Sequence, residues 1–164
     1  MIKSETSIIS RPKRQFFKNL FSFTIRPTAN ETTEPLEIKA LLAEKNPEIQ
    51  KGIVYDLAKK YGPLKALEYM RNSGLPFTGQ THLLVHEIGN FAYSTYGEDA
   101  LKYCDESFLS ACYHGVILNE LGDHGLAGVS AMIAQCSEAG KPVFTQCAHA
   151  AGHGFLAWTD YKVL

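Results

Sequence analysis

Apolar residues recur at helical spacing through most of the chain. Residues 36–45 combine helix-forming composition with apolar positions three and four apart. Asn46 before Pro47 is typical of a helix start, and Gly62 is typical of the end of a helix that runs to about Lys60. No stretch shows the sustained alternation of β-branched residues that strands require. The pattern therefore predicts an all-α fold.

Two more helices are expected to follow. Pro63 opens the first and Gly74 closes it. Thr78 or Thr81 caps a longer helix that ends near Tyr96. The expected helices have roughly 10–16 residues and short connections, which are the lengths that helical hairpins require.

A weak repeat runs through the second half of the chain. Residues 112–114 and 147–149 share the pattern Cys-x-His and lie 35 positions apart, and residues 80–82 occupy the equivalent place in an earlier unit. A third unit begins near Gly125. We therefore expect three helix pairs, preceded by a less regular pair over about residues 36–60, packed as a short α-solenoid or bundle of helical-hairpin repeats.

The four cysteines follow this repeat. Cys104 and Cys112 fall in the second unit and Cys136 and Cys147 in the third, whereas the first unit has none. A repeat unit that has either both cysteines or neither is the pattern expected if the two cysteines of a unit form a disulfide within its hairpin. Disulfides would imply an oxidising compartment, so an extracytoplasmic location is expected if the cysteines are bonded.

Two alternatives remain for these cysteines. In one, Cys112 and Cys147 join His114 and His149 in a zinc site. Helix geometry disfavours it, since positions i and i+2 lie about 200° apart and cannot face one ion. In the other, the cysteines are four buried free thiols that pack as small apolar side chains.

Residues 61–160 resemble the helical-hairpin repeats of the Sel1-like group, relatives of the tetratricopeptide repeat that include cysteine-rich members. In those proteins a cysteine at the end of the first helix bridges to one at the start of the second, and the spacing of Cys104 and Cys112 is similar. The glycine and aromatic positions of the group match only in part. The resemblance implies an architecture and not a chemistry, because those repeats do not characteristically carry histidines.

Five of the six histidines fall on the second helices of these units. His82 and His86 form one His-x-x-x-His pair, and His149 and His153 form another. Positions i and i+4 differ by only about 40° around a helix, so each pair presents two imidazoles on one face. His114 holds the position equivalent to His82 and His149. If the second helices lie side by side, all five histidines share one surface.

This cluster predicts a metal site. Imidazole ligands suit Zn, Cu, Fe or Ni better than Ca or Mg, so we expect a transition metal ion such as Zn, Cu or Fe, or haem. Glu120 and Asp123 are candidates to support the ligands or to join them, and His124 is expected in a loop. The predicted ligands are His82, His86, His114, His149 and His153.

Glycines interrupt the histidine-bearing helices at positions 89, 115, 152 and 154. Each costs about 1 kcal/mol relative to alanine in a helix. Close helix packing is the expected reason, and a flat ligand such as haem against the backbone is the alternative. The histidines themselves have a structural alternative, in which they hydrogen-bond to the backbone or to Tyr93, Tyr96 and Tyr113.

Two functions follow from these observations. The first is a metal- or haem-binding all-α domain, with a metalloenzyme as one form of it. The second is a disulfide-linked helical-repeat module that binds a protein without catalysis. The sequence holds no phosphate-binding loop, His-Glu-x-x-His helix or Gly-x-Ser-x-Gly elbow, so it does not predict a reaction.

The N-terminal part differs in composition. Residues 1–26 carry six basic residues and one acidic residue, so an arm of net charge +5 precedes a body of net charge −6. Its apolar cluster, residues 16–25, is too short for a membrane span, which takes about 20 apolar residues. We interpret residues 1–35 as a basic arm and linker for targeting or membrane-surface contact, and residues 36–164 as the helical-repeat domain. A flexible tail that docks its aromatic side chains on the body is the alternative.

The overall charge and the C-terminal segment bear on partners. A net charge of −1 argues against a nucleic-acid partner. The apolar residues Trp158, Tyr161, Val163 and Leu164 stand where a solenoid normally has a polar capping helix. We therefore expect a protein partner, or self-association through the C-terminal helix.

Overall fold

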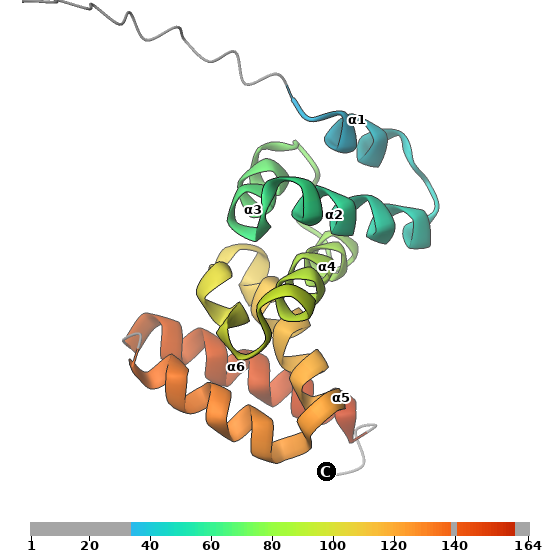
Figure 1. Ribbon diagram of the computed structural model, residues 1–164. Coiled ribbons are helices and arrows are strands. Elements are labelled where there is room, and N and C mark those ends of the chain that lie inside the picture. Colours follow the sequence, from blue (N-terminus) through green and yellow to red (C-terminus); the bar gives the residue numbers. More distant parts are fainter. Residues whose placement is uncertain (1–33, 139–140, 160–164) are drawn as a thin grey trace, which may run out of the picture. The chain divides into compact units, whose positions relative to one another are not determined.

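The computed structural model describes residues 34–138 and 141–159 (Figure 1). These ranges contain helices and no strand, which confirms the all-α prediction. The predicted arm, residues 1–26, and the apolar residues after Trp158 lie outside the described residues. The elements are α1 (Leu36–Ala43), α2 (Pro47–Tyr61), α3 (Pro63–Asn72), α4 (Gly79–Tyr96), the 3-10 helix η1 (Gly97–Tyr103), α5 (Ser107–Glu138) and α6 (Lys141–Trp158).

The helix ends use the capping residues expected from the sequence. The side chain of Asn46 accepts a hydrogen bond of 3.0 Å from the backbone N–H of Glu48 at the start of α2. Thr78, and not Thr81, caps α4, because its hydroxyl accepts a bond of 3.2 Å from the Thr81 N–H. Gly62 follows α2 with a φ of 82°, a value that favours glycine.

The long helix α5 is interrupted twice. Phe108, Leu109 and Ser110 have φ values of 54°, 54° and 62°, so they form a left-handed turn of three residues that are not glycine. Gly125, with a φ of 62°, makes the second break. Two regular segments result, residues 111–124 and 126–138. The left-handed turn costs about 1–2 kcal/mol per residue, so its surroundings must hold it in place.

Both predicted cysteine pairs are disulfides. The Cα atoms of Cys104 and Cys112 are 5.4 Å apart, and those of Cys136 and Cys147 are 6.2 Å apart. No free cysteine remains, so the free-thiol and Cys/His zinc-site alternatives are wrong. The first disulfide spans the left-handed turn and ties its two ends together. Two such bonds fit an oxidising environment, and no helix in the described ranges has the length and apolarity that a membrane crossing demands.

Helix α5 packs against α4 and against α6, and α6 runs beside the second part of α5 (Figure 1). The buried side chains Val85 and Ile88 on α4 and Val116 and Ile117 on α5 belong to this core. The second predicted unit begins with the 3-10 helix η1, where the repeat pattern predicts an α-helix. The arrangement as regular repeats in a solenoid stays a prediction.

Two glycines let the backbones of α4 and α5 touch. A Cβ atom at Gly89 would overlap the carbonyl oxygen of Cys112 and would lie 3.0 Å from the Cα of Gly115. A Cβ atom at Gly115 would in turn overlap the carbonyl oxygen of His86. Close helix packing, the expected reason for these glycines, is therefore present at this crossing.

The other two helical glycines differ from each other. A Cβ atom at Gly154 on α6 would come within 3.1 Å of Ile117 on α5, so this glycine also serves close packing. A Cβ atom at Gly152 would meet nothing within 4 Å. Packing thus accounts for Gly154 and leaves Gly152 without a structural reason.

The crossing of α4 and α5 can be tested with a matched pair of substitutions. Gly89→Ala should lower the free energy of unfolding by about 2–3 kcal/mol, because the new methyl group forces two backbones apart. Gly152→Ala, on an exposed part of α6, should leave stability unchanged or raise it by up to about 1 kcal/mol. Chemical denaturation followed by circular dichroism measures both. Equal effects of the two substitutions would contradict the close contact.

Candidate metal centre

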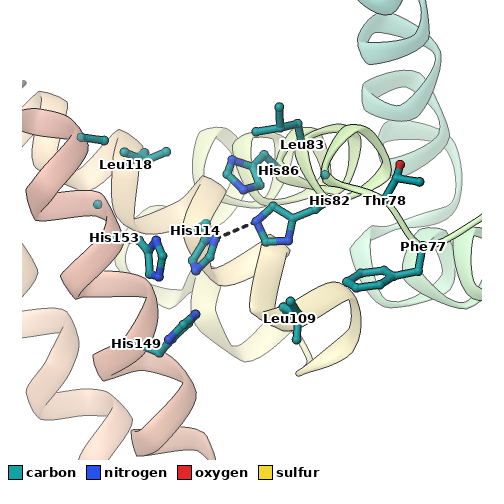
Figure 2. A pocket seen from close by; sticks show the side chains of 13 residues that line it. Phe77, Thr78, His82, Leu83, His86, Leu109, His114, Leu118, His149 and His153 are labelled. Atoms are coloured by element: carbon teal, nitrogen blue, oxygen red, sulfur yellow. Dashed lines mark hydrogen bonds between the residues drawn. The ribbon is translucent and has the colours of Figure 1, made fainter.

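A pocket of about 640 Å³ opens between α4, α5 and α6 (Figure 2). Its volume lies within the range of small-molecule sites. All five predicted histidines line it, so the sequence correctly grouped residues from three helices. Apolar side chains form the rest of the wall, and these include Phe77, Leu83, Leu109 and Leu118.

His82, His86 and His114 form the tightest part of the cluster. Their ring centroids are 4.9 Å apart for His82 and His86, 5.0 Å for His82 and His114, and 5.3 Å for His86 and His114. One nitrogen of each ring lies within 4.8 Å of a nitrogen of the other two. Among the described residues, no other group of three histidine, cysteine or acidic side chains converges in this way. We call these three residues the histidine triad.

The glycine crossing is what brings the triad together. His82 and His86 lie one turn apart on α4, and Gly89 follows within the next turn. On α5, His114 directly precedes Gly115. Because the two backbones touch at Gly89 and Gly115, side chains that leave each helix beside this point reach the same place.

Hydrogen bonds orient two of the three rings. His82 Nδ1 donates to the backbone carbonyl of Phe108 over 2.6 Å, since a carbonyl can only accept. Neutral His82 then carries no proton on Nε2, which accepts a bond of 3.1 Å from His114 Nδ1 (Figure 2). With its proton on Nδ1, neutral His114 has an unprotonated Nε2. The carbonyl of the left-handed turn therefore sets the tautomers of two histidines.

The same contacts suit a bound ion. A histidine that ligates a metal through one nitrogen commonly donates its other N–H to a carbonyl, as His82 does here. Two nitrogens bound to one tetrahedral zinc ion at 2.0–2.1 Å lie about 3.3 Å apart. The separation of His82 Nε2 and His114 Nδ1, 3.1 Å, is close to that value. An ion could therefore take the place of the shared proton, which would move to Nε2 of His114, with little movement of the rings.

Two triad nitrogens are buried without a partner. His86 Nε2 and His114 Nε2 are inaccessible to water and make no hydrogen bond in the structure. Buried polar atoms are nearly always hydrogen-bonded, so each of these two nitrogens needs an explanation. A metal ion on the lone pair of His86 Nε2 would explain the first. With the ion on Nδ1 of His114, the second nitrogen would carry the ring proton and could donate it to a bound molecule. The third such atom, Glu120 Oε2, belongs to a different cluster.

His86 and His114 are held in the form that binds metals. Burial, followed by the charges of the neighbouring histidines, lowers the pKa of His114 to about 3. Burial and then His82 lower the pKa of His86 to about 4. Both side chains are therefore neutral at physiological pH. A histidine must be neutral to ligate a metal, so no proton has to leave these two rings first.

His149 and His153 on α6 complete the cluster from the opposite wall. Their ring centroids are 4.6 Å apart, and they lie 5.5 Å and 5.3 Å from the ring of His114. Both side chains are exposed, unlike that of His114. His114 thus stands between two histidine pairs. The structure brings all five predicted residues together, and their role as ligands stays a prediction.

Glu120, Asp123 and His124 lie apart from the pocket. Glu120 Oε1 accepts a bond of 3.0 Å from His124 Nδ1, and Asp123 accepts a bond of 3.1 Å from the hydroxyl of Tyr93. None of these residues lines the pocket. The group that supports a clustered histidine is the carbonyl of Phe108, which sequence patterns did not indicate.

The tyrosines expected in the structural alternative also bond elsewhere. Tyr93 donates to Asp123, Tyr113 donates to the carbonyl of Cys104 over 3.3 Å, and Tyr96 stacks on Tyr103. The backbone part of that alternative holds for a single nitrogen, Nδ1 of His82. Tyrosine bonds therefore do not account for the histidine cluster.

Comparison with known proteins does not assign this chain to a family or a function. The sequence matches no protein-family model, and neither a curated protein nor a solved structure matches it. The Sel1-like resemblance accordingly stays a prediction. The function has to be argued from the geometry of the pocket.

The lowered pKa values of His86 and His114 predict acid-dependent stability of the metal-free protein. Their folded-state pKa values lie below the ordinary 6.5, so the unfolded chain binds protons that the folded chain does not. Above about pH 7 the two groups should have no effect. Between about pH 6.5 and pH 4 each should reduce the free energy of unfolding by up to about 1.4 kcal/mol per pH unit.

Chemical denaturation at a series of pH values tests this dependence. His114→Gln should make the acid slope shallower, because it removes one buried histidine. His149→Gln, at an exposed position in the same pocket, should leave the slope nearly as it is. Identical slopes in the unsubstituted chain and in both variants would contradict the assignment.

Proposed function

We propose that this protein binds one transition metal ion through His82, His86 and His114. The observation that carries the proposal is the convergence of three imidazoles, two of which have buried nitrogens without a partner. The lowered pKa values support it because they keep His86 and His114 neutral, and the Phe108 carbonyl supports it because it orients the ring of His82. Zinc, copper or iron suits this set of ligands.

A single ion suits the triad better than haem does. Haem iron offers at most two axial positions to the protein, on opposite sides of the porphyrin. Three nitrogens that converge on one point match a facial set of ligands on one ion instead. The glycines also give no support to haem at the crossing, because helix contact already accounts for Gly89 and Gly115.

An open coordination position would make the site reactive. Structural zinc sites are closed by four protein ligands, whereas three protein ligands and one water are typical of catalytic sites. An ion held there would lower the pKa of its bound water and would polarise a carbonyl group. The exposed imidazoles of His149 and His153 face the same pocket and could exchange protons with a bound molecule. A metal-dependent hydrolytic or hydration reaction is the class that these groups support.

The disulfides support an extracytoplasmic site of action. Two bonded cysteine pairs persist in the periplasm, the secretory pathway or outside the cell, and they are rare in the cytosol. Each disulfide also ends two residues before a histidine of the cluster, Cys112 before His114 and Cys147 before His149. The bonds would therefore stabilise the pocket walls as well as the fold.

The metal site can be tested by equilibrium binding of Zn²⁺ and Co²⁺ to the full chain prepared without chelator. We expect about one tight ion per chain. His86→Gln and His114→Gln should each weaken binding by more than about 100-fold, because loss of a ligand should exceed the 10–100-fold effect of a supporting residue. The double variant His149→Gln/His153→Gln should retain the tight site.

His124→Gln is the matched control, because His124 lies outside the pocket. Two results would contradict the proposal. One is a protein that takes up neither ion. The other is a protein whose tight site survives both triad substitutions and disappears with the His149/His153 pair, which would place the ion on α6.

The disulfide that spans the left-handed turn should control metal affinity. Replacing Cys104 and Cys112 with alanine should weaken metal binding by about 10–100-fold, because the turn would no longer hold the Phe108 carbonyl against His82. Replacing Cys136 and Cys147 with alanine is the matched control and should have a smaller effect. Circular dichroism confirms that both variants are folded before binding is measured. Equal losses of affinity would show that the turn has no special role.

A further inference from the structure

Among the described residues, the histidines are the only ionisable side chains that line the pocket around the triad. None of the described aspartate, glutamate, lysine or arginine side chains lines it. Glu87 follows His86 directly in the sequence, yet its carboxylate accepts a bond of 2.8 Å from Asn90 and does not reach the pocket wall. A divalent ion bound by neutral histidines would therefore keep its full positive charge. An uncompensated charge in a partly buried site is costly, so the open position favours an anion.

Two further features of the pocket favour negative charge. The N-terminus of α4, an 18-residue helix, contributes its N-cap Thr78 and its first residue Gly79 to the wall, and helix N-termini attract anions. Independently, His114 is only 5% exposed and its buried Nε2 has no partner; with the ion on Nδ1, this nitrogen would carry a proton that an anion can accept. That atom belongs to a residue lining the same pocket, as Figure 2 shows. The anion-attracting groups thus meet at the histidine end.

The mouth of the pocket is apolar. Phe77, Leu83 and Leu109 all line it, with exposed fractions of 58%, 54% and 64%. Exposed large apolar side chains gathered in one place mark a binding surface rather than a core. Leu109 also belongs to the left-handed turn, so strained backbone holds this leucine at the opening. Strain of this kind is typical of ligand-binding segments.

These features together specify a ligand. We infer that the site takes a small amphiphilic carboxylate, whose anionic group binds the metal ion and whose aliphatic or aromatic body lies against Phe77, Leu83 and Leu109. The inference rests on the proposed metal site. A pocket of about 640 Å³ is far larger than an ion and a water need, and it accommodates such a body. Charge complementarity selects the head group and the apolar mouth selects the body.

The test uses the Co²⁺-loaded full chain, because the visible spectrum of Co²⁺ reports its ligands. Octanoate, acetate and octanol are titrated into it separately. Octanoate should perturb the Co²⁺ spectrum and should bind at least about 100-fold more tightly than acetate, which has the same head group and almost no body. Octanol has the body without the charge and should leave the spectrum unchanged.

A pair of substitutions tests the apolar mouth. Leu83→Gln/Leu109→Asn should weaken octanoate binding by at least about 10-fold and leave acetate and Co²⁺ binding unchanged. Asparagine is chosen at position 109 because it tolerates the left-handed conformation. Leu64→Gln is the matched control, an equally exposed leucine on α3 that does not line the pocket.

The outcomes separate the two proposals. Tight Co²⁺ binding with octanoate no stronger than acetate, or with octanol as strong as octanoate, overturns the amphiphilic ligand and leaves the metal site standing. Octanoate binding that the mouth variant does not weaken also overturns it. Failure to bind Co²⁺ at all overturns the metal site, and the inference with it.

Discussion

The contact between Gly89 on α4 and Gly115 on α5 is the constraint on which the site depends. Side chains as small as alanine would separate the two backbones there. Because they touch, His82 and His86 on one helix and His114 on the other meet at distances that suit a single ion. The cost of two glycines in helices is thus offset by a geometry that larger residues could not provide.

A second constraint acts on the orientation of the rings. The left-handed turn at Phe108, Leu109 and Ser110 is unfavourable for residues with side chains, and the Cys104–Cys112 disulfide closes the chain around it. This turn places the carbonyl oxygen of Phe108 against His82 and the side chain of Leu109 at the pocket mouth. Strained backbone, a covalent link and two groups that serve the site, the Phe108 carbonyl and Leu109, therefore coincide in residues 104–112. Such coincidence is typical of functional regions.

Much of the fold could be predicted from local signals. Asn46, Gly62 and Gly97 mark helix ends because capping and positive φ depend on the residue itself. The cysteine pairs followed from their joint presence in two units. The five histidines could be grouped because the i, i+4 spacing fixes which helix face carries them, and similar helices were expected to lie side by side.

The finer geometry could not be predicted, because it depends on contacts distant in the sequence. Nothing in Phe108, Leu109 and Ser110 signals a left-handed turn, so the carbonyl that orients His82 was missed. Spacing alone also could not separate the buried or half-buried histidines of the triad from the exposed pair on α6, since burial depends on how the helices cross. Their place in the sequence makes Glu120 and Asp123 candidates to support the ligands, yet they bond to His124 and Tyr93.

X-ray absorption spectroscopy of the zinc-loaded chain tests the central claim most directly, because it counts and identifies the atoms bound to the ion. The account predicts about three imidazole nitrogens at 2.0–2.1 Å, one light-atom ligand from water or a bound anion, and no sulfur. The same spectrum should persist in the His149→Gln/His153→Gln variant. A sulfur neighbour, fewer than three imidazoles, or loss of the signal in that variant would contradict the triad as the metal site.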